Sequence, residues 1–86
     1  MSVGAVKATL REGNTSLEQA SATVESIGAA LAEVETLVLH TLHGSQQSDA
    51  KAARSNIADA TREVRLLLRT ITAAQQHATA RLKSLG

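Results

Sequence analysis

The feature that most constrains this 86-residue chain is an apolar repeat with alternating spacings of three and four residues in each half of the sequence. In the first half, ten of the twelve positions at this spacing are apolar. In the second half, nine consecutive positions are apolar before the repeat shifts by one residue to Leu82 and Leu85. Such periodicity is typical of long helices that pack along a shared line of side chains, here called the seam. The large side chains expected in the seam are Val24, Ile27, Leu31, Val34, Ile57, Val64, Leu67 and Ile71.

The composition favours an all-α fold. The chain contains no Pro, Cys, Phe, Trp or Tyr, whereas Ala and Leu account for 16 and 11 residues. Strands favour aromatic and β-branched residues and hairpin turns favour Gly or Pro pairs, so all-β and α/β folds are not expected. The absence of Cys excludes disulfide frameworks, thiol catalysis and thiolate metal sites.

One segment between the two repeats carries the signals of a helix end followed by a helix start. Gly44 can adopt the left-handed conformation that terminates a helix, and His40 and His43 precede it, where the negative helix end favours positive charge. Ser45 or Ser48 can then cap the second helix. A connection this short requires the two helices to fold back antiparallel.

The sequence therefore predicts a single helical hairpin over residues 1–86, with a helix over about 3–43, a turn at 44–47 and a helix over about 48–84. The alternative is a second break at Gly13-Asn14, because a capping box follows it. An interior glycine costs a helix only about 1 kcal/mol, and the repeat continues through it, so one long first helix is the preferred interpretation.

The charges of the two halves are complementary. The first half has a net charge of −3 and the second half a net charge of +4, which favours antiparallel docking. A fold about residues 45–46 would place Glu35 beside Arg54 and Glu25 beside Arg65. Exposed pairs of this kind contribute about 0.2–1 kcal/mol each, so they would set register more than stability.

Two helices of this composition make a thin core, because five of the nine seam positions of the second helix are Ala. Further apolar side chains lie outside the expected seam, and a lone hairpin would leave several of them in water. We therefore expect a second hairpin to complete a four-helix bundle, either as a homodimer or as a heterodimer with a related helical protein. The outlying side chains are Leu37, Leu39, Leu42, Leu66 and Leu68.

No catalytic or cofactor site is predicted, since the chain has no glycine-rich phosphate loop, nucleophile elbow or zinc-binding helix motif. His40 and His43, with Asp49 across the turn, are the one candidate for a weak metal site; favourable charges at a helix end are the simpler interpretation. The sequence has no stretch of 18 apolar residues that could span a membrane and no signal peptide near Met1. The compartment is left open, either cytoplasmic or exported by a leaderless route.

A basic face on the second helix is the candidate binding surface. Arg62, Arg65 and Arg69 share one side of the helix, and Arg54 lies two turns earlier. This face suggests an alternative function, an intracellular helical scaffold or regulator that binds an acidic partner or nucleic acid. The absence of aromatic side chains for base stacking and the adjacent acidic helix argue against nucleic acid.

In architecture and in its turn, the chain resembles the WXG family of type VII (ESX) secretion substrates and their small helical relatives. In that family a Trp-x-Gly motif forms the turn between two helices. Leu42-His43-Gly44 occupies the corresponding place here, so Gly44 matches and Leu42 stands where Trp is expected. The family's C-terminal export signal, an aromatic residue followed four positions later by an acidic one, has no counterpart in residues 77–86. The resemblance implies a non-catalytic helical hairpin that pairs with itself or with an effector or toxin and takes part in its export.

Overall fold

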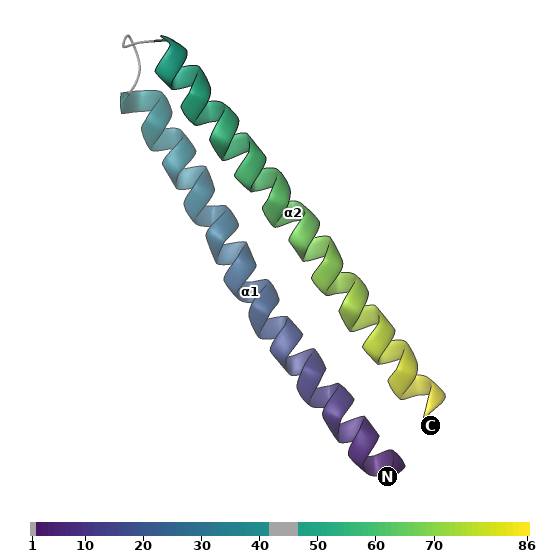
Figure 1. Cartoon of the computed structure of the whole chain (residues 1–86). Coiled ribbons are helices and arrows are strands. Elements are labelled where there is room, and N and C mark those ends of the chain that lie inside the picture. The colour runs from purple at the N-terminus through teal and green to yellow at the C-terminus, as the bar shows by residue number, and fades with distance from the viewer. Residues whose placement is uncertain (1, 42–46) are drawn as a thin grey trace.

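The computed structural model describes residues 2–41 and 47–86, and it is an antiparallel hairpin of two long helices (Figure 1). Helix α1 spans Val3–Thr41 and helix α2 spans Gln47–Ser84. The predicted all-α hairpin is therefore confirmed, and α2 begins one residue earlier than expected. Most of the predicted turn, including Leu42, His43 and Gly44, lies outside the described residues.

Helix α1 runs through Gly13 without interruption, so the alternative break at Gly13-Asn14 is absent from this described segment. The side chains of the candidate capping box explain why. The Thr15 hydroxyl donates to the carbonyl oxygen of Arg11 at 3.1 Å, which is the bond that a threonine makes inside a helix. The seam continues on both sides of this point, and packing against α2 outweighs the small cost of one glycine.

The start of α1 is capped, and the two helices are joined at the open end of the hairpin. The Ser2 hydroxyl accepts a hydrogen bond from the backbone N–H of Ala5 at 3.1 Å, which is the usual N-cap arrangement. The Lys7 ammonium Nζ donates to the backbone oxygen of Gly86 at 2.6 Å. This bond fixes the level at which the end of α2 lies beside α1.

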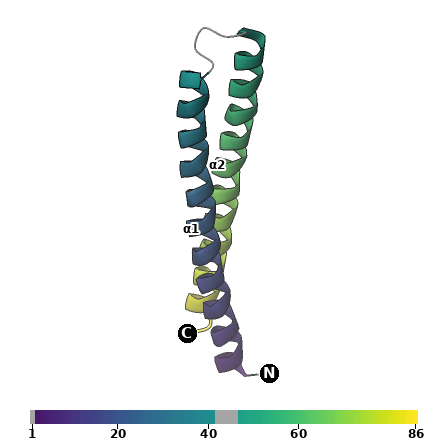
Figure 2. The same ribbon diagram turned by 90° about the vertical axis from the view of Figure 1, so that its left-hand side faces the viewer.

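The hairpin is a rod. Its principal dimensions are 64, 16 and 14 Å, and its radius of gyration is 19.4 Å, against about 12 Å for a compact domain of this length. Figure 1 shows α1 and α2 side by side along their length, and in Figure 2, turned by 90°, the first half of α1 passes in front of the second half of α2. Each helix can therefore bury only the strip that faces the other.

The seam matches the predicted positions in part, and Leu31 and Val64 are half-buried in it as predicted. The buried apolar residues are Val24, Ile57 and Ile71, all expected there. In α2 the seam follows two lines of residues spaced by seven, with no shift before Leu82 and Leu85. One line is Ile57, Val64, Ile71, Ala78 and Leu85, and the other is Thr61, Leu68, Gln75 and Leu82.

The second line of each helix therefore lies one residue later than predicted. Leu67 was placed in the seam and Leu68 outside it, whereas the structure exposes Leu67 and half-buries Leu68. Likewise, Ile27 and Val34 are exposed and Gly28 faces α2. A Cβ atom built on Gly28 would lie 3.4 Å from Cγ1 of Val64, which is ordinary van der Waals contact, so the helices do not require glycine at this level.

The predicted ion pairs between the helices are wrong. Within residues 2–41 and 47–86, the single ion pair shorter than 4.0 Å joins Arg62 to Asp59 at 3.2 Å, inside α2. The contacts that join the helices pair residues whose numbers add to 92 or 93, as Asn14 with Thr79. The predicted partners add to 89 or 90. At 1.5 Å per residue this offset displaces Glu35 from Arg54 by about 5 Å along the rod, and Glu25 from Arg65 by about 4 Å.

Candidate interaction surface

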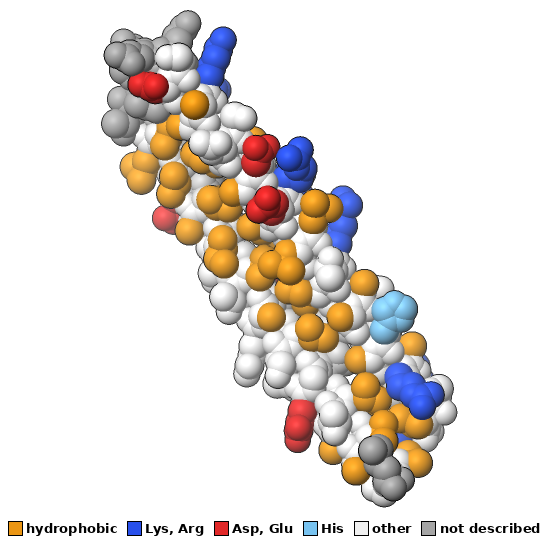
Figure 3. Space-filling model, viewed as in Figure 1, with side chains coloured by type: hydrophobic (Ala, Val, Ile, Leu, Met, Phe, Trp, Pro, Cys, Tyr) orange, Lys and Arg blue, Asp and Glu red, His pale blue; other side chains and the backbone are white. Residues whose placement is uncertain are grey.

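One side of the hairpin carries large apolar side chains that the seam leaves uncovered. Ile27, Val34 and Leu37 of α1 are 49, 44 and 64% exposed, and Leu67 of α2 is 48% exposed. Ile27 and Val34 are seven residues apart and Leu37 follows by three, so all three lie on one side of α1. We call these four residues the apolar face. Figure 3 shows hydrophobic side chains gathered along the junction of the two helices.

A shallow groove of about 290 Å³ joins the two helices within this face. It shows that Ile27 and Leu67 lie on the same side of the hairpin, because both line it. Its walls are otherwise apolar, except for the carboxylate-bearing side chain of Glu63 at its edge. The lining residues are Val24, Ile27 and Leu31 from α1 and Ala60, Glu63, Val64 and Leu67 from α2.

The other predicted interface leucines lie elsewhere. Leu39 and Leu66 are exposed, but each points away from the apolar face. Leu39 is two residues beyond Leu37 and therefore about 200° further round α1, and Leu66 is about 100° from Leu67 round α2. Leu31, Val64 and Leu68 are half-buried between the helices. The sequence thus identified residues of the apolar face but divided them between the seam and the outlying leucines.

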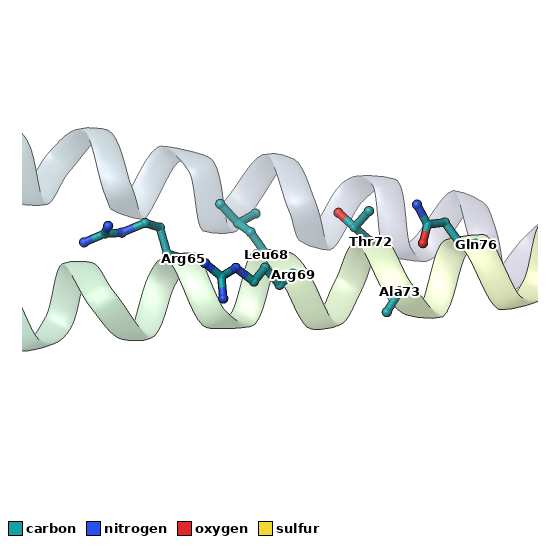
Figure 4. Close-up of a pocket in the computed structure, with 6 residues that line it drawn as sticks. All are labelled: Arg65, Leu68, Arg69, Thr72, Ala73 and Gln76. Carbon is teal, nitrogen blue, oxygen red and sulfur yellow. The ribbon is translucent and has the colours of Figure 1, made fainter.

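The basic face is an exposed side of α2. Arg54, Arg62, Arg65 and Arg69 are all exposed, and Arg62 is paired with Asp59. Figure 4 shows the pocket of about 360 Å³ at this face, in which Leu68 points toward α1 and Ala73 points away from it. All six lining residues come from α2, so the pocket is open helix surface and encloses no ligand. The lining residues are Arg65, Leu68, Arg69, Thr72, Ala73 and Gln76.

The candidate metal site is not assembled from described residues alone, because His43 falls in the segment outside them. Across the two helices as described, no three His, Cys, Asp or Glu side chains gather closely enough to hold a metal ion. Neither of the described helices is both long and apolar enough to cross a membrane.

Comparisons of the chain with protein-family models, with curated proteins and with solved structures give no match. The geometry of the hairpin is therefore the basis for its functional interpretation. The signal that would have located the apolar face from sequence is the spacing of Leu82 and Leu85. Steps of seven residues back from Leu85 reach Ile57, and steps of seven residues back from Leu82 reach Leu68. Leu67 belongs to neither line and therefore lies outside the seam.

Proposed function

We propose that this chain is a non-catalytic helical interaction module, and that the apolar face is the surface through which it binds a helical partner. The observation that carries the proposal is the contrast between burial and exposure. The two described helices bury three apolar residues against each other, while four large apolar side chains remain 44–64% exposed on one side. Exposed apolar residues gathered on one face are typical of a protein interaction site.

The total surface supports the same conclusion. A folded monomer of 9.0 kDa is expected to expose about 4,900 Å², whereas this hairpin exposes 6373 Å². The excess, about 1,500 Å² on one chain, exceeds the roughly 800 Å² that one partner contributes to a standard interface. A partner that supplies two helices would complete a four-helix bundle around the apolar face.

We further propose that the partnership belongs to type VII secretion, where the chain pairs with itself or with an exported effector. Support comes from the resemblance to the WXG family, which rests on the two-helix hairpin and on the sequence match of Gly44 to the motif glycine. The test follows a tagged chain in culture filtrate, with and without the ATPase of the secretion system. Dependence on the ATPase is expected, and equal amounts in both filtrates would contradict this part of the proposal.

The apolar face itself is tested by sedimentation equilibrium on the chain and its isolated partner. Interference optics suit the measurement because the chain has no Trp or Tyr. Leu67→Glu should weaken association by at least about tenfold, because it places a charge inside the covered surface. Leu66→Glu is the matched control and should leave association unchanged. Equal effects of the two variants would show that the apolar face is not the binding surface.

A second candidate function is a scaffold or regulator that binds acidic partners through Arg54, Arg62, Arg65 and Arg69. Its support is the exposure of all four side chains on α2. Retardation of nucleic acid in a gel, weakening as salt is raised, is the expected result for a nucleic-acid partner. No shift at low salt would exclude that version.

A further inference from the structure

We propose that the partner on the apolar face is a different chain, an amphipathic helix or helix pair whose apolar stripe is bordered by Lys and Arg. This inference rests on the proposed function and specifies the chemistry of the partner. It comes from the charges that surround the apolar face, which are carboxylates on both helices, whereas the arginines of α2 lie away from it.

Carboxylates border the apolar face on both helices. On α2, Glu63 lines the groove, and Asp49 lies on the same side because it is separated from Glu63 by two seven-residue repeats. Asp59 lies seven residues before Leu66 and therefore points away from the apolar face. On α1, Glu33 lies one turn before Leu37. Glu33, Asp49 and Glu63 are all exposed, and we call them the acidic border.

Cations are scarce around this part of the face. Within residues 20–40 and 48–73, the helix positions that flank the apolar face carry no Lys or Arg. Arg62 is the nearest cation, and its guanidinium contacts Asp59 at 3.2 Å. Among described residues, Glu33, Asp49 and Glu63 have no ion-pair partner within 4.0 Å. A partner with basic flanks would meet these three carboxylates and gain both affinity and orientation.

A second copy of the chain fits this surface poorly. The exposed apolar residues lie in the half of the rod near the turn, so two copies cover each other's apolar halves only when their turns lie at the same end. That arrangement sets α1 of one copy on α2 of the other and brings Glu33 of one near Glu63 of the other. Like charges at such distances repel.

With the turns at opposite ends, the second copy offers less apolar surface. Val34 and Leu37 would then face the first half of α1 of the other copy. There Ala5, Val6, Thr9 and Leu10 line a groove of about 380 Å³, but Val3 is the one large apolar side chain of residues 2–20 that is exposed. Neither arrangement of two identical chains therefore matches the apolar face in both shape and charge.

The side of the hairpin that carries the apolar face measures 64 by 16 Å, a projected area of about 1,000 Å², and the apolar face occupies about half of it. A partner on this half alone would cover less than the roughly 800 Å² that each partner contributes to a standard interface, so we expect the partner to extend along the whole side. A helix pair would cover it completely. A single helix about 10 Å across would fill the groove between Ile27 and Leu67.

The test uses two synthetic amphipathic peptides with the same Leu and Ile stripe, one with Lys and the other with Glu at every flanking position. Fluorescence anisotropy should show that the Lys peptide binds at least about tenfold more tightly at low salt, and that raising the salt removes most of this preference. The net charge of the chain is +1, so nonspecific attraction would favour the Glu peptide. A preference for Lys therefore reports the acidic border.

Substitutions in the chain test which carboxylates cause the preference for the Lys peptide. The double variant Glu33→Gln with Glu63→Gln should lose most of the preference while circular dichroism shows unchanged helicity. Glu18→Gln with Glu25→Gln is the matched control, because these carboxylates lie on the side of α1 away from the apolar face, and it should keep the preference. Loss of the preference in the control alone would overturn the assignment to the acidic border.

Three other results would overturn the inference, and they differ in what they imply for the proposed function. Equal binding of both peptides, abolished by Leu67→Glu, would retain the apolar face but reject a basic partner. Binding of neither peptide by a chain that forms a dimer sensitive to Leu67→Glu would identify a second copy as the occupant. Binding of neither peptide by a monomer would reject the inference and remove the main support for the proposed function.

Discussion

At the scale of single residues, the seam of this hairpin contains small and polar side chains at places where a stronger core would have leucine. Asn14 is half-buried in the seam, and its Nδ2 donates to the hydroxyl of Thr79 at 3.3 Å. Its Oδ1 is buried and has no hydrogen-bond partner among the described residues. A polar group in this position reduces stability, because Oδ1 is left unpaired, and restricts the register of the helices, because Nδ2 needs an acceptor such as the Thr79 hydroxyl opposite it.

The glycines of α1 allow a direct test of the helix interior. Gly13→Ala should raise the free energy of unfolding by about 0.5–1 kcal/mol, because alanine favours the helix and the added methyl group meets no atom within 4 Å. Gly28→Ala should gain at least as much, since its methyl group would reach ordinary contact distance, 3.4 Å, from Val64. Urea unfolding followed by circular dichroism at one chain concentration measures both. A loss of stability in Gly28→Ala alone would mean that the helices lie closer together than described.

At the scale of the helices, the sequence predicted the hairpin correctly but not which strip of each helix faces the other. Hydrophobicity alone favours Ala60, Leu67 and Ala74 over Thr61, Leu68 and Gln75, because the first set is entirely apolar. The structure half-buries the whole second set, which continues in sevens to Leu82, whereas it half-buries Ala60 of the first set and exposes Leu67 and Ala74. The long apolar side chain of Leu82 contributes more buried area than an alanine of the first set, Ala60 or Ala74, would.

The register and the apolar face were harder to predict for a related reason. The level at which two helices meet depends on the geometry of the turn, and the charge pattern tolerates displacement by a few residues because exposed pairs contribute so little. If the strip is placed one residue too early, Leu67 is predicted to face the other helix and Leu68 to lie outside the seam. Sequence reasoning could therefore find that uncovered leucines exist, but it could not gather Ile27, Val34, Leu37 and Leu67 onto one side.

Substitutions of the adjacent residues Leu67 and Leu68 test which strip of α2 faces α1. At a chain concentration at which the wild type is monomeric, Leu68→Asp should lower stability by about 2–4 kcal/mol and reduce the helical signal, because it places a charge between the helices. Leu67→Asp should leave the helical signal unchanged, since this side chain is already 48% exposed. Circular dichroism measures both variants under the same conditions. If Leu67→Asp lost more stability and helical signal than Leu68→Asp, the strip predicted from sequence would be the one that faces α1.

At the scale of the whole molecule, the rod has a small apolar core and a large exposed surface. A chain that buries three apolar residues among those described, and exposes about 1,500 Å² more than a compact protein of its mass, has little stability of its own. Its helices present one apolar side with an acidic border and an opposite side that carries the arginines Arg54, Arg65 and Arg69. In a complex of the kind we propose, the first side would be covered and the second would remain available to water or to other partners.

Partner binding should therefore appear as a large gain in thermal stability. A ligand that binds only the folded chain, present at about 100 times its Kd, adds about 2.7 kcal/mol. For a domain of this length each kcal/mol raises Tm by about 4–8 °C, so the Lys-flanked peptide should raise Tm by roughly 10–20 °C. Leu66→Glu should show the same increase, because that side chain points away from the apolar face. Leu67→Glu should show almost none at the same peptide concentration. An increase that persists in Leu67→Glu would mean that the peptide stabilises the rod from another side, and that the uncovered leucines do not determine where the partner binds.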